Sequence, residues 1–221
     1  MKKFLSLLMV TSMLFYGQAC SVQSGLAGLS PLKALSGVQN ILGLASGSAI
    51  SGLGKNLLSN AALSSVMPPQ LQAITGALGK SDAGQKVLGF TNNAIGAAAP
   101  ALAQGVLANA VKGIDASSAL DILKGGENGA TNFLKNAVGS KMTDALGPAL
   151  GKALGGAGVG DMLTSALGSN AAGLLGGNTP SIESLITQAT SSGIFGLMGQ
   201  AEKAERANPT DPLLKEIFGG K

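Results

Sequence analysis

Residues 128–146, NGATNFLKNAVGSKMTDAL, carry the clearest helical signal in this chain of 221 residues. The apolar side chains recur at spacings of three and four, which places them along one face of a helix: Phe133, Leu134, Ala137, Val138, Met142, Ala145 and Leu146. We expect Asn128 to cap the start of this helix. The helix is expected to reach Leu146, and Pro148 discourages its continuation without strain, because proline lacks the N–H that continuation requires.

The segment just before it predicts a shorter helix and a sharp corner. Asp115, Ser117 and Ser118 offer capping oxygens to a helix that contains Ala119, Leu120, Ile122 and Leu123. Gly125 and Gly126 follow, and glycine readily adopts the left-handed backbone with which many helices end. The chain is therefore expected to turn at these two glycines and enter the helix of 128–146.

The C-terminal part predicts one long and one short helix. Between Ser181 and Glu205 one face is apolar, and it is formed by Ile182, Leu185, Ile186, Ala189, Ile194, Leu197, Met198 and Ala201. The polar side chains are expected on the other faces, and they are Glu183, Gln188, Glu202 and Glu205. Pro209 and Pro212 should end this helix, and residues 213–218 form a last amphipathic turn or two. Alternating strand patterns are missing. The sequence therefore predicts an all-α fold, a multi-helix orthogonal bundle.

The composition excludes several classes of enzyme and cofactor site. The chain has no His, no Trp and one Cys, and hydrophobic residues make up 45% of it. It therefore cannot hold a Ser-His-Asp or Cys-His pair, a His/Cys zinc site or an internal disulfide, although it can bury a core. We expect no catalytic residue, no metal and no cofactor, and hence a protein that is not an enzyme.

The N-terminus predicts export and lipid attachment. Lys2 and Lys3 precede an apolar run from Phe4 to Tyr16, which is too short to cross a bilayer comfortably and is typical of a signal peptide. Because Ala19 precedes the single cysteine, Cys20, residues 1–19 resemble a bacterial lipoprotein signal peptide. The resemblance implies cleavage between Ala19 and Cys20 and a diacylglyceryl group on the thiol. An ordinary secretory signal cut near Ala19, or a buried N-terminal helix of a cytoplasmic protein, are the alternatives.

The predicted mature chain then has three parts. Cys20 is the lipid-bearing residue, residues 20–30 form a flexible Ser/Gly-rich stalk, and residues 31–219 form the helical domain. Ser21 is not the Asp that favours inner-membrane retention, so we expect an outer-membrane lipoprotein facing the periplasm. Without the leader, 13 basic groups face 11 acidic ones, and only Arg206 is an arginine. This scattered charge predicts no binding to nucleic acid.

Three stretches without charge must be tested as membrane helices. They are residues 34–54, 87–111 and 162–182, and each contains Gly and polar side chains that make insertion unfavourable. We interpret them as buried or half-buried helices of a soluble domain. Gly147, Gly151 and Gly155 recur every fourth residue, a spacing that brings helices close together in lipid. Several such pairs are expected by chance in a chain with 34 Gly, and we attribute the rest to tight packing in a soluble bundle.

Three segments resemble the bacterial domain of unknown function 4197 family. They are NAALSSVMPPQ at 60–70, SALDILKGGENGATNFLKN at 118–136, and the stretch from Thr187 through AEKAERANP to LLKEIFGG at 213–220. The resemblance covers about 31 to 219. It implies an exported, lipid-anchored, all-helical protein of a Gram-negative bacterium. Residues 94–103 and 147–177 depart from it, because they are rich in Ala, Gly and Leu where family members are rich in charge.

The central motif of that family carries over to seven residues of this chain, and they are Asp121, Gly125, Gly126, Glu127, Ala130, Thr131 and Phe133. Physically, the two glycines suit a structural corner with Glu127 at a helix start, where a carboxylate gains about 0.3–1 kcal/mol from the helix dipole. The alternative is that Asp121 and Glu127 form a carboxylate pair for acid/base chemistry or a cation.

Two classes of function remain after these exclusions. The first is a lipid-tethered helical scaffold in the periplasm that binds an envelope protein partner or an apolar ligand. The second is a membrane-active or self-assembling protein that uses the Gly-spaced helices. The sequence leaves the oligomeric state open.

Overall fold

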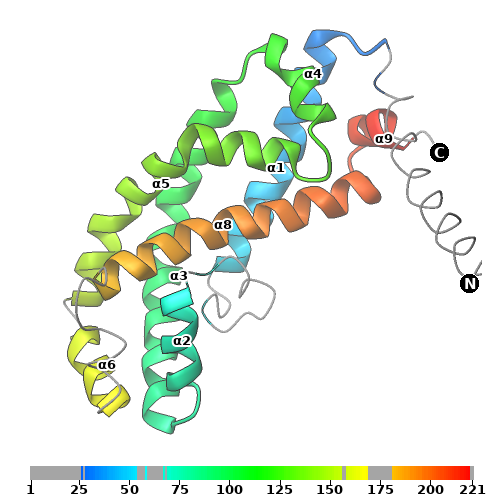
Figure 1. Ribbon diagram of the computed structural model, residues 1–221. Helices are drawn as coiled ribbons and strands as arrows, with labels where there is room; N and C mark the ends of the chain where they lie inside the picture. The colour runs from blue at the N-terminus through cyan, green and yellow to red at the C-terminus, as the bar shows by residue number, and fades with distance from the viewer. Residues whose placement is uncertain are drawn as a thin grey trace, which may run out of the picture.

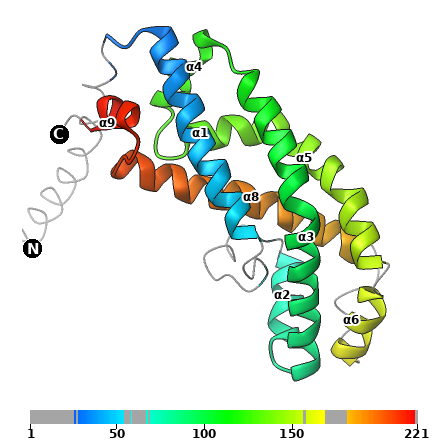
Figure 2. The same ribbon diagram turned by 180° about the vertical axis from the view of Figure 1, so that it is seen from behind.

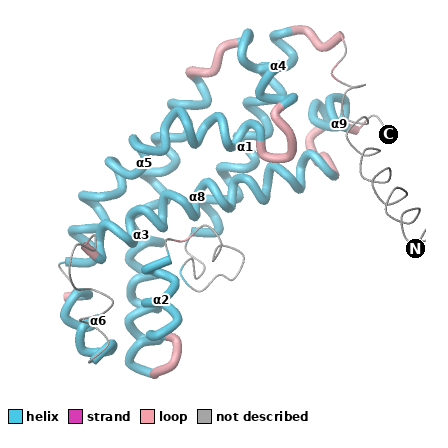
Figure 3. The backbone as a smooth tube through the Cα atoms, viewed as in Figure 1, coloured by secondary structure: helices cyan, strands magenta, loops and turns pink. Residues whose placement is uncertain are grey.

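The computed structural model of the chain describes residues 26, 28–53, 58, 67, 69–155, 158–168 and 181–219. The elements in this part of the chain are α-helices, which confirms the predicted all-α class (Figures 1 and 3). Their bounds are α1 Pro31–Leu53, α2 Pro69–Leu78, α3 Asp82–Lys112, α4 Ala116–Lys124, α5 Gly129–Gly155, α6 Val159–Leu167, α8 Ile182–Ala207 and α9 Pro212–Phe218. The predicted signal peptide and Cys20 lie outside the described residues.

Capping side chains fix the starts of four helices, of which Ser81 caps α3. The Asp115 carboxylate caps α4 by accepting the Ser118 N–H at 2.8 Å. Hydrogen bonds from the Ser117 hydroxyl and the Ser118 N–H lower the pKa of Asp115 from 3.8 to about 2. Ser181 and Asp211 cap α8 and α9 in the same way. The predicted capping of α4 by Asp115 and the predicted start of the long C-terminal helix are confirmed.

Helix α8 lies across α1 and α3 and forms the centre of the domain (Figures 1 and 2). It packs along α1 and α5, while α3 packs on α5 and α1. The start of α1, α4 and α9 lie toward one end of the molecule, and α2, the start of α3 and α6 lie at the opposite end. One apolar core runs through these helices and includes residues from every one of them.

Helix α5 does not end near Pro148. It continues to Gly155, with Pro148 inside it, so the predicted end is wrong. Proline inside a helix costs about 3 kcal/mol. The apolar spacing of four continues past it, and Leu146, Leu150 and Leu154 are all fully buried. Burial of a leucine side chain contributes about 1.5–3 kcal/mol, so the two leucines beyond Pro148 offset the lost hydrogen bond.

The buried strip of α5 is narrower than the sequence pattern suggests. Its buried residues follow a spacing of four from Leu134 through Val138 and Met142 to Leu146. Phe133 is 37% exposed and Ala137 is exposed, so their predicted placement on the core face is wrong. A single line of buried side chains runs along α5, and Phe133, Ala137 and Lys141, each one position before a buried residue, are exposed.

The three uncharged stretches have different outcomes in the structure. Helix α1 buries Ala34, Val38 and Ile41 completely. Helix α3 is the one described helix that is long and apolar enough to cross a membrane. Its most apolar 18-residue window has a mean hydropathy of 1.4, and 22% of that window is buried. Most of the stretch 162–182 lies outside the described residues.

The Gly-spaced repeat of α5 does not mark tight packing. A Cβ atom built on Gly147, Gly151 or Gly155 would meet no atom within 4 Å. Tight packing, one of the two explanations offered for the repeat, therefore does not account for these three glycines.

Candidate functional site

The family-motif residues gather at the corner between α4 and α5. The Gly125 N–H donates to the Ile122 carbonyl oxygen at 3.2 Å and closes α4. Gly126 then takes a φ of 81°, the left-handed backbone expected there. Gly125 has a φ of −69°, so the prediction that both glycines are left-handed is wrong for this residue.

The corner is tight because α5 starts against the end of α4. A Cβ atom on Gly129, the first residue of α5, would lie 2.5 Å from the Ile122 carbonyl oxygen. Real Cβ atoms do not come this close to backbone, so the approach depends on glycine. Gly129 is not among the seven motif residues predicted from the sequence.

A buried carboxylate from α8 caps the start of α5. Glu202 is fully buried, and its Oε1 and Oε2 accept the N–H groups of Ala130 and Thr131 at 2.9 and 2.7 Å. These are two of the donors that a helix start leaves without a partner inside the helix. The prediction that Glu202 lies on a polar face is therefore wrong.

A guanidinium from the next turn of α8 caps the end of α4. The Arg206 Nε donates to Glu202 Oε1 at 2.8 Å, and its Nη1 donates to the Leu123 carbonyl oxygen at 2.7 Å. The guanidinium carbon also lies 4.9 Å from the centre of the Phe218 ring of α9. Each charge therefore sits at the helix end that its sign suits, the carboxylate at an N-terminus and the guanidinium at a C-terminus.

Asn128 connects the corner to α8 instead of capping α5 with its side chain. Its carbonyl oxygen accepts the Asn132 N–H at 2.9 Å, as expected of a residue just before a helix. With its amide oriented to form hydrogen bonds, the side-chain nitrogen donates to the Gly199 carbonyl oxygen at 2.7 Å. The predicted side-chain cap is replaced by Glu202.

The two acidic residues of the motif do not form a buried pair. Asp121 and Glu127 are both exposed, and Glu127 forms an ion pair with Lys203 at 2.7 Å in which both side chains are more than half exposed. The carboxylate bound to the first N–H groups of α5 is that of Glu202 and not that of Glu127. Among the described residues, no group of three or more acidic or Cys side chains could hold a metal ion.

The remaining motif residues divide between core and surface. Ala130 and Thr131 are buried beside Glu202, and the Thr131 hydroxyl has no hydrogen-bond partner in the described part of the chain. Phe133 lies outward on α5. The motif thus specifies the corner between two helices and its attachment to α8.

Comparison with known families identifies the chain. The sequence profile of the family described as "Protein of unknown function (DUF4197)" matches residues 28–219. The chain belongs to the DUF4197 family. No curated protein and no solved structure matches it.

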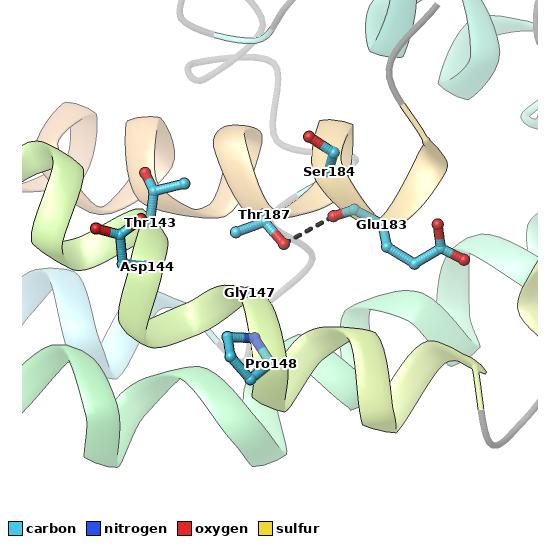
Figure 4. A pocket seen from close by; sticks show the side chains of 7 residues that line it. All are labelled: Thr143, Asp144, Gly147, Pro148, Glu183, Ser184 and Thr187. Carbon is cyan, nitrogen blue, oxygen red and sulfur yellow. Dashed lines mark hydrogen bonds between the residues drawn. The ribbon is translucent and has the colours of Figure 1, made fainter.

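In this DUF4197 protein a cavity of about 370 Å³ lies away from the corner, between α5 and α8 (Figure 4). Five of its seven lining residues have a hydroxyl or carboxyl side chain, and the lining consists of Thr143, Asp144, Gly147, Pro148, Glu183, Ser184 and Thr187. The Thr187 hydroxyl donates to the Glu183 carbonyl oxygen at 2.7 Å. The carboxylates of Asp144 and Glu183 point away from each other, so they do not converge on one bound group.

The corner geometry predicts opposite outcomes at two neighbouring residues. Gly126→Val should lower the free energy of unfolding by at least about 1–2 kcal/mol, because a β-branched residue is strained at positive φ. Glu127→Gln should cost only about 0.2–1 kcal/mol, because the ion pair that it breaks is exposed. Urea midpoints of both variants and the parent measure this. A Gly126→Val protein as stable as the parent would contradict the left-handed corner.

Proposed function

We propose that this DUF4197 protein is a lipid-anchored envelope protein whose helical domain acts as a scaffold or partner-binding module rather than as an enzyme. The observation that carries the proposal is the single cysteine, Cys20, placed after Ala19 and an apolar leader. Two acyl signals on such a cysteine are enough for stable anchoring, at about 0.8 kcal/mol per buried methylene. Ser21 supports a position at the outer membrane, facing the periplasm.

The chemistry of the corner supports a structural rather than a catalytic use of the family motif. Glu202 and Arg206 bind each other and the two helix ends, so their hydrogen-bonding groups are directed at the protein itself. An active site would aim such groups into an open cavity where a substrate can reach them. We therefore propose that the motif maintains the shape of the domain, and that function resides in its surface.

A protein partner suits the domain better than an apolar ligand. Of the seven residues that line the cavity between α5 and α8, none is aromatic and Pro148 is the one with a hydrophobic side chain. Pockets for apolar ligands are lined mostly by hydrophobic and aromatic side chains. We accordingly propose an envelope protein as the partner.

A membrane-active protein is the second candidate, and one observation favours it. Helix α3 has no charge from 87 to 111, and only 22% of its most apolar window is buried. Insertion of α3 would require it to leave α5 and α1, against which it packs. We therefore place this candidate second.

Substitution of Cys20 tests the proposal. The parent should partition into the detergent phase of a cloud-point separation, and its mature N-terminal peptide should carry acyl chains by mass spectrometry. A Cys20→Ser protein should lose both properties, and a version of it without residues 1–19 should be soluble and helical by circular dichroism. The acyl chains supply the partitioning energy in this scheme.

Two results would contradict the proposal in different ways. A parent without acyl chains at Cys20 would exclude the lipid anchor. If the leaderless Cys20→Ser protein aggregated until lipid was added, the membrane-active candidate would replace the scaffold.

A further inference from the structure

The described chain begins close to the predicted lipid. Leu26 is 6% exposed and belongs to the core, and its carbonyl oxygen accepts the Leu29 N–H at 3.3 Å. Only residues 21–25 therefore separate Cys20 from a residue packed on the domain. Six residue steps span at most roughly 20 Å. The predicted stalk of 20–30 is thus too long, because Leu26 and Leu29 in its last part pack on the core.

A tether of this length holds one end of the molecule close to the membrane. Leu26 precedes the start of α1, which lies toward the same end as α4 and α9 (Figures 1 and 2). Helices α1 and α9 are in contact, and Lys33 forms an ion pair with Glu216 across them. The bilayer that holds the acyl chains must lie within reach of this end, while α2 and α6 lie at the other.

Among the described residues, the most exposed large hydrophobic side chain lies at the same end. Leu32, in the first turn of α1, is 73% exposed, whereas the other exposed large hydrophobic side chains of the described residues are 37–41% exposed. Lys33, the next residue, is neutralised by Glu216. An apolar side chain beside a neutralised charge suits the boundary between headgroups and acyl chains.

We propose that the end of the domain formed by the start of α1 and α9 docks on the bilayer that holds the Cys20 lipid, with Leu32 inserted among the lipids. The inference rests on the lipid anchor of the proposed function. It fixes the orientation of the domain. The opposite end, with α2, the start of α3 and α6, then faces away from the membrane and is the surface left free for a partner.

Single tryptophans test this orientation, because the natural chain has none. Leu32→Trp and the matched control Met162→Trp, which replaces a side chain 39% exposed on α6, are made in the full lipid-modified protein. Each is reconstituted in vesicles of phosphatidylethanolamine and phosphatidylglycerol with brominated acyl chains. We expect the Leu32→Trp emission to shift to shorter wavelength and to lose most of its intensity to the bromine quencher. The Met162→Trp emission should stay as it is in unbrominated vesicles.

The outcomes separate the docking from the anchor. If mass spectrometry shows the acyl chains on Cys20 but both tryptophans are quenched equally, or neither is quenched, the docking is wrong and the anchor stands. If the acyl chains are missing, the anchor itself is wrong and the docking falls with it.

Discussion

Glu202→Gln should lower the free energy of unfolding by about 3–5 kcal/mol, the usual cost of breaking a buried ion pair from one side. The substitution keeps the shape of the side chain and removes its charge. The Arg206 side chain, 8% exposed, is then left as a buried charge without its counter-ion. The new amide also has one acceptor oxygen for the N–H groups of Ala130 and Thr131, where the carboxylate has two. Urea midpoints and slopes measure the loss, which is a large part of the roughly 5–15 kcal/mol that holds a domain folded.

A double substitution identifies the cause of that loss. Arg206→Met alone should also be costly, because it leaves the Glu202 charge buried, whereas Glu202→Gln combined with Arg206→Met removes both charges. We expect the double variant to be more stable than the sum of the single losses predicts, by about 0.5–3 kcal/mol. Glu127→Gln is the matched control, because it breaks an exposed pair with Lys203. If Glu202→Gln cost no more than this control, the pair would not fasten the corner to α8.

The helix starts and the turn that depend on neighbouring residues were predicted correctly from the sequence. Asp115 and Ser181 cap helices at the expected starts because a capping side chain acts within its own first turn. Gly126 takes the expected left-handed backbone because only the next few residues decide it. These features follow from sequence separations of less than one helical turn.

The placement of Glu202 could not be derived from such patterns. In the sequence it is one of several charged residues on the predicted polar side of a helix, and its hydrogen-bond partners lie 72 and 71 residues earlier in the chain. Its burial depends on the packing of α5 against α8. One signal was present, because Arg206 is the single arginine and follows Glu202 by four residues, the spacing of a helical ion pair.

The continuation of α5 past Pro148 was not predicted from the sequence, for a related reason. A rule based on the missing N–H considers the helix alone. Leu150 and Leu154 are fully buried, so packing of the domain outweighs the local preference. The same packing leaves Phe133, a motif residue, outward. The candidate site was therefore located at the correct corner, but the residues that fasten it were found only in the folded chain.

Gly129→Ala should lower the free energy of unfolding by roughly 2–4 kcal/mol, combining overpacking with weakened hydrogen bonds. The added Cβ would lie 2.5 Å from the Ile122 carbonyl oxygen, and this neighbour is backbone that cannot rotate away. The start of α5 would have to move, which would pull Ala130 and Thr131 from Glu202. Gly129 does not have positive φ, so steric overlap alone predicts the loss.

Gly151→Ala is the matched control for Gly129→Ala, because it makes the same chemical change in the same helix. A Cβ atom on Gly151 meets no atom within 4 Å. Alanine should therefore raise the free energy of unfolding by about 0.5–1 kcal/mol, the difference between the two residues in a helix interior. The two variants are expected to shift the urea midpoint in opposite directions. A stabilised Gly129→Ala protein would show that α5 does not start in contact with the end of α4, and the role assigned to Gly129 in the corner would have to be withdrawn.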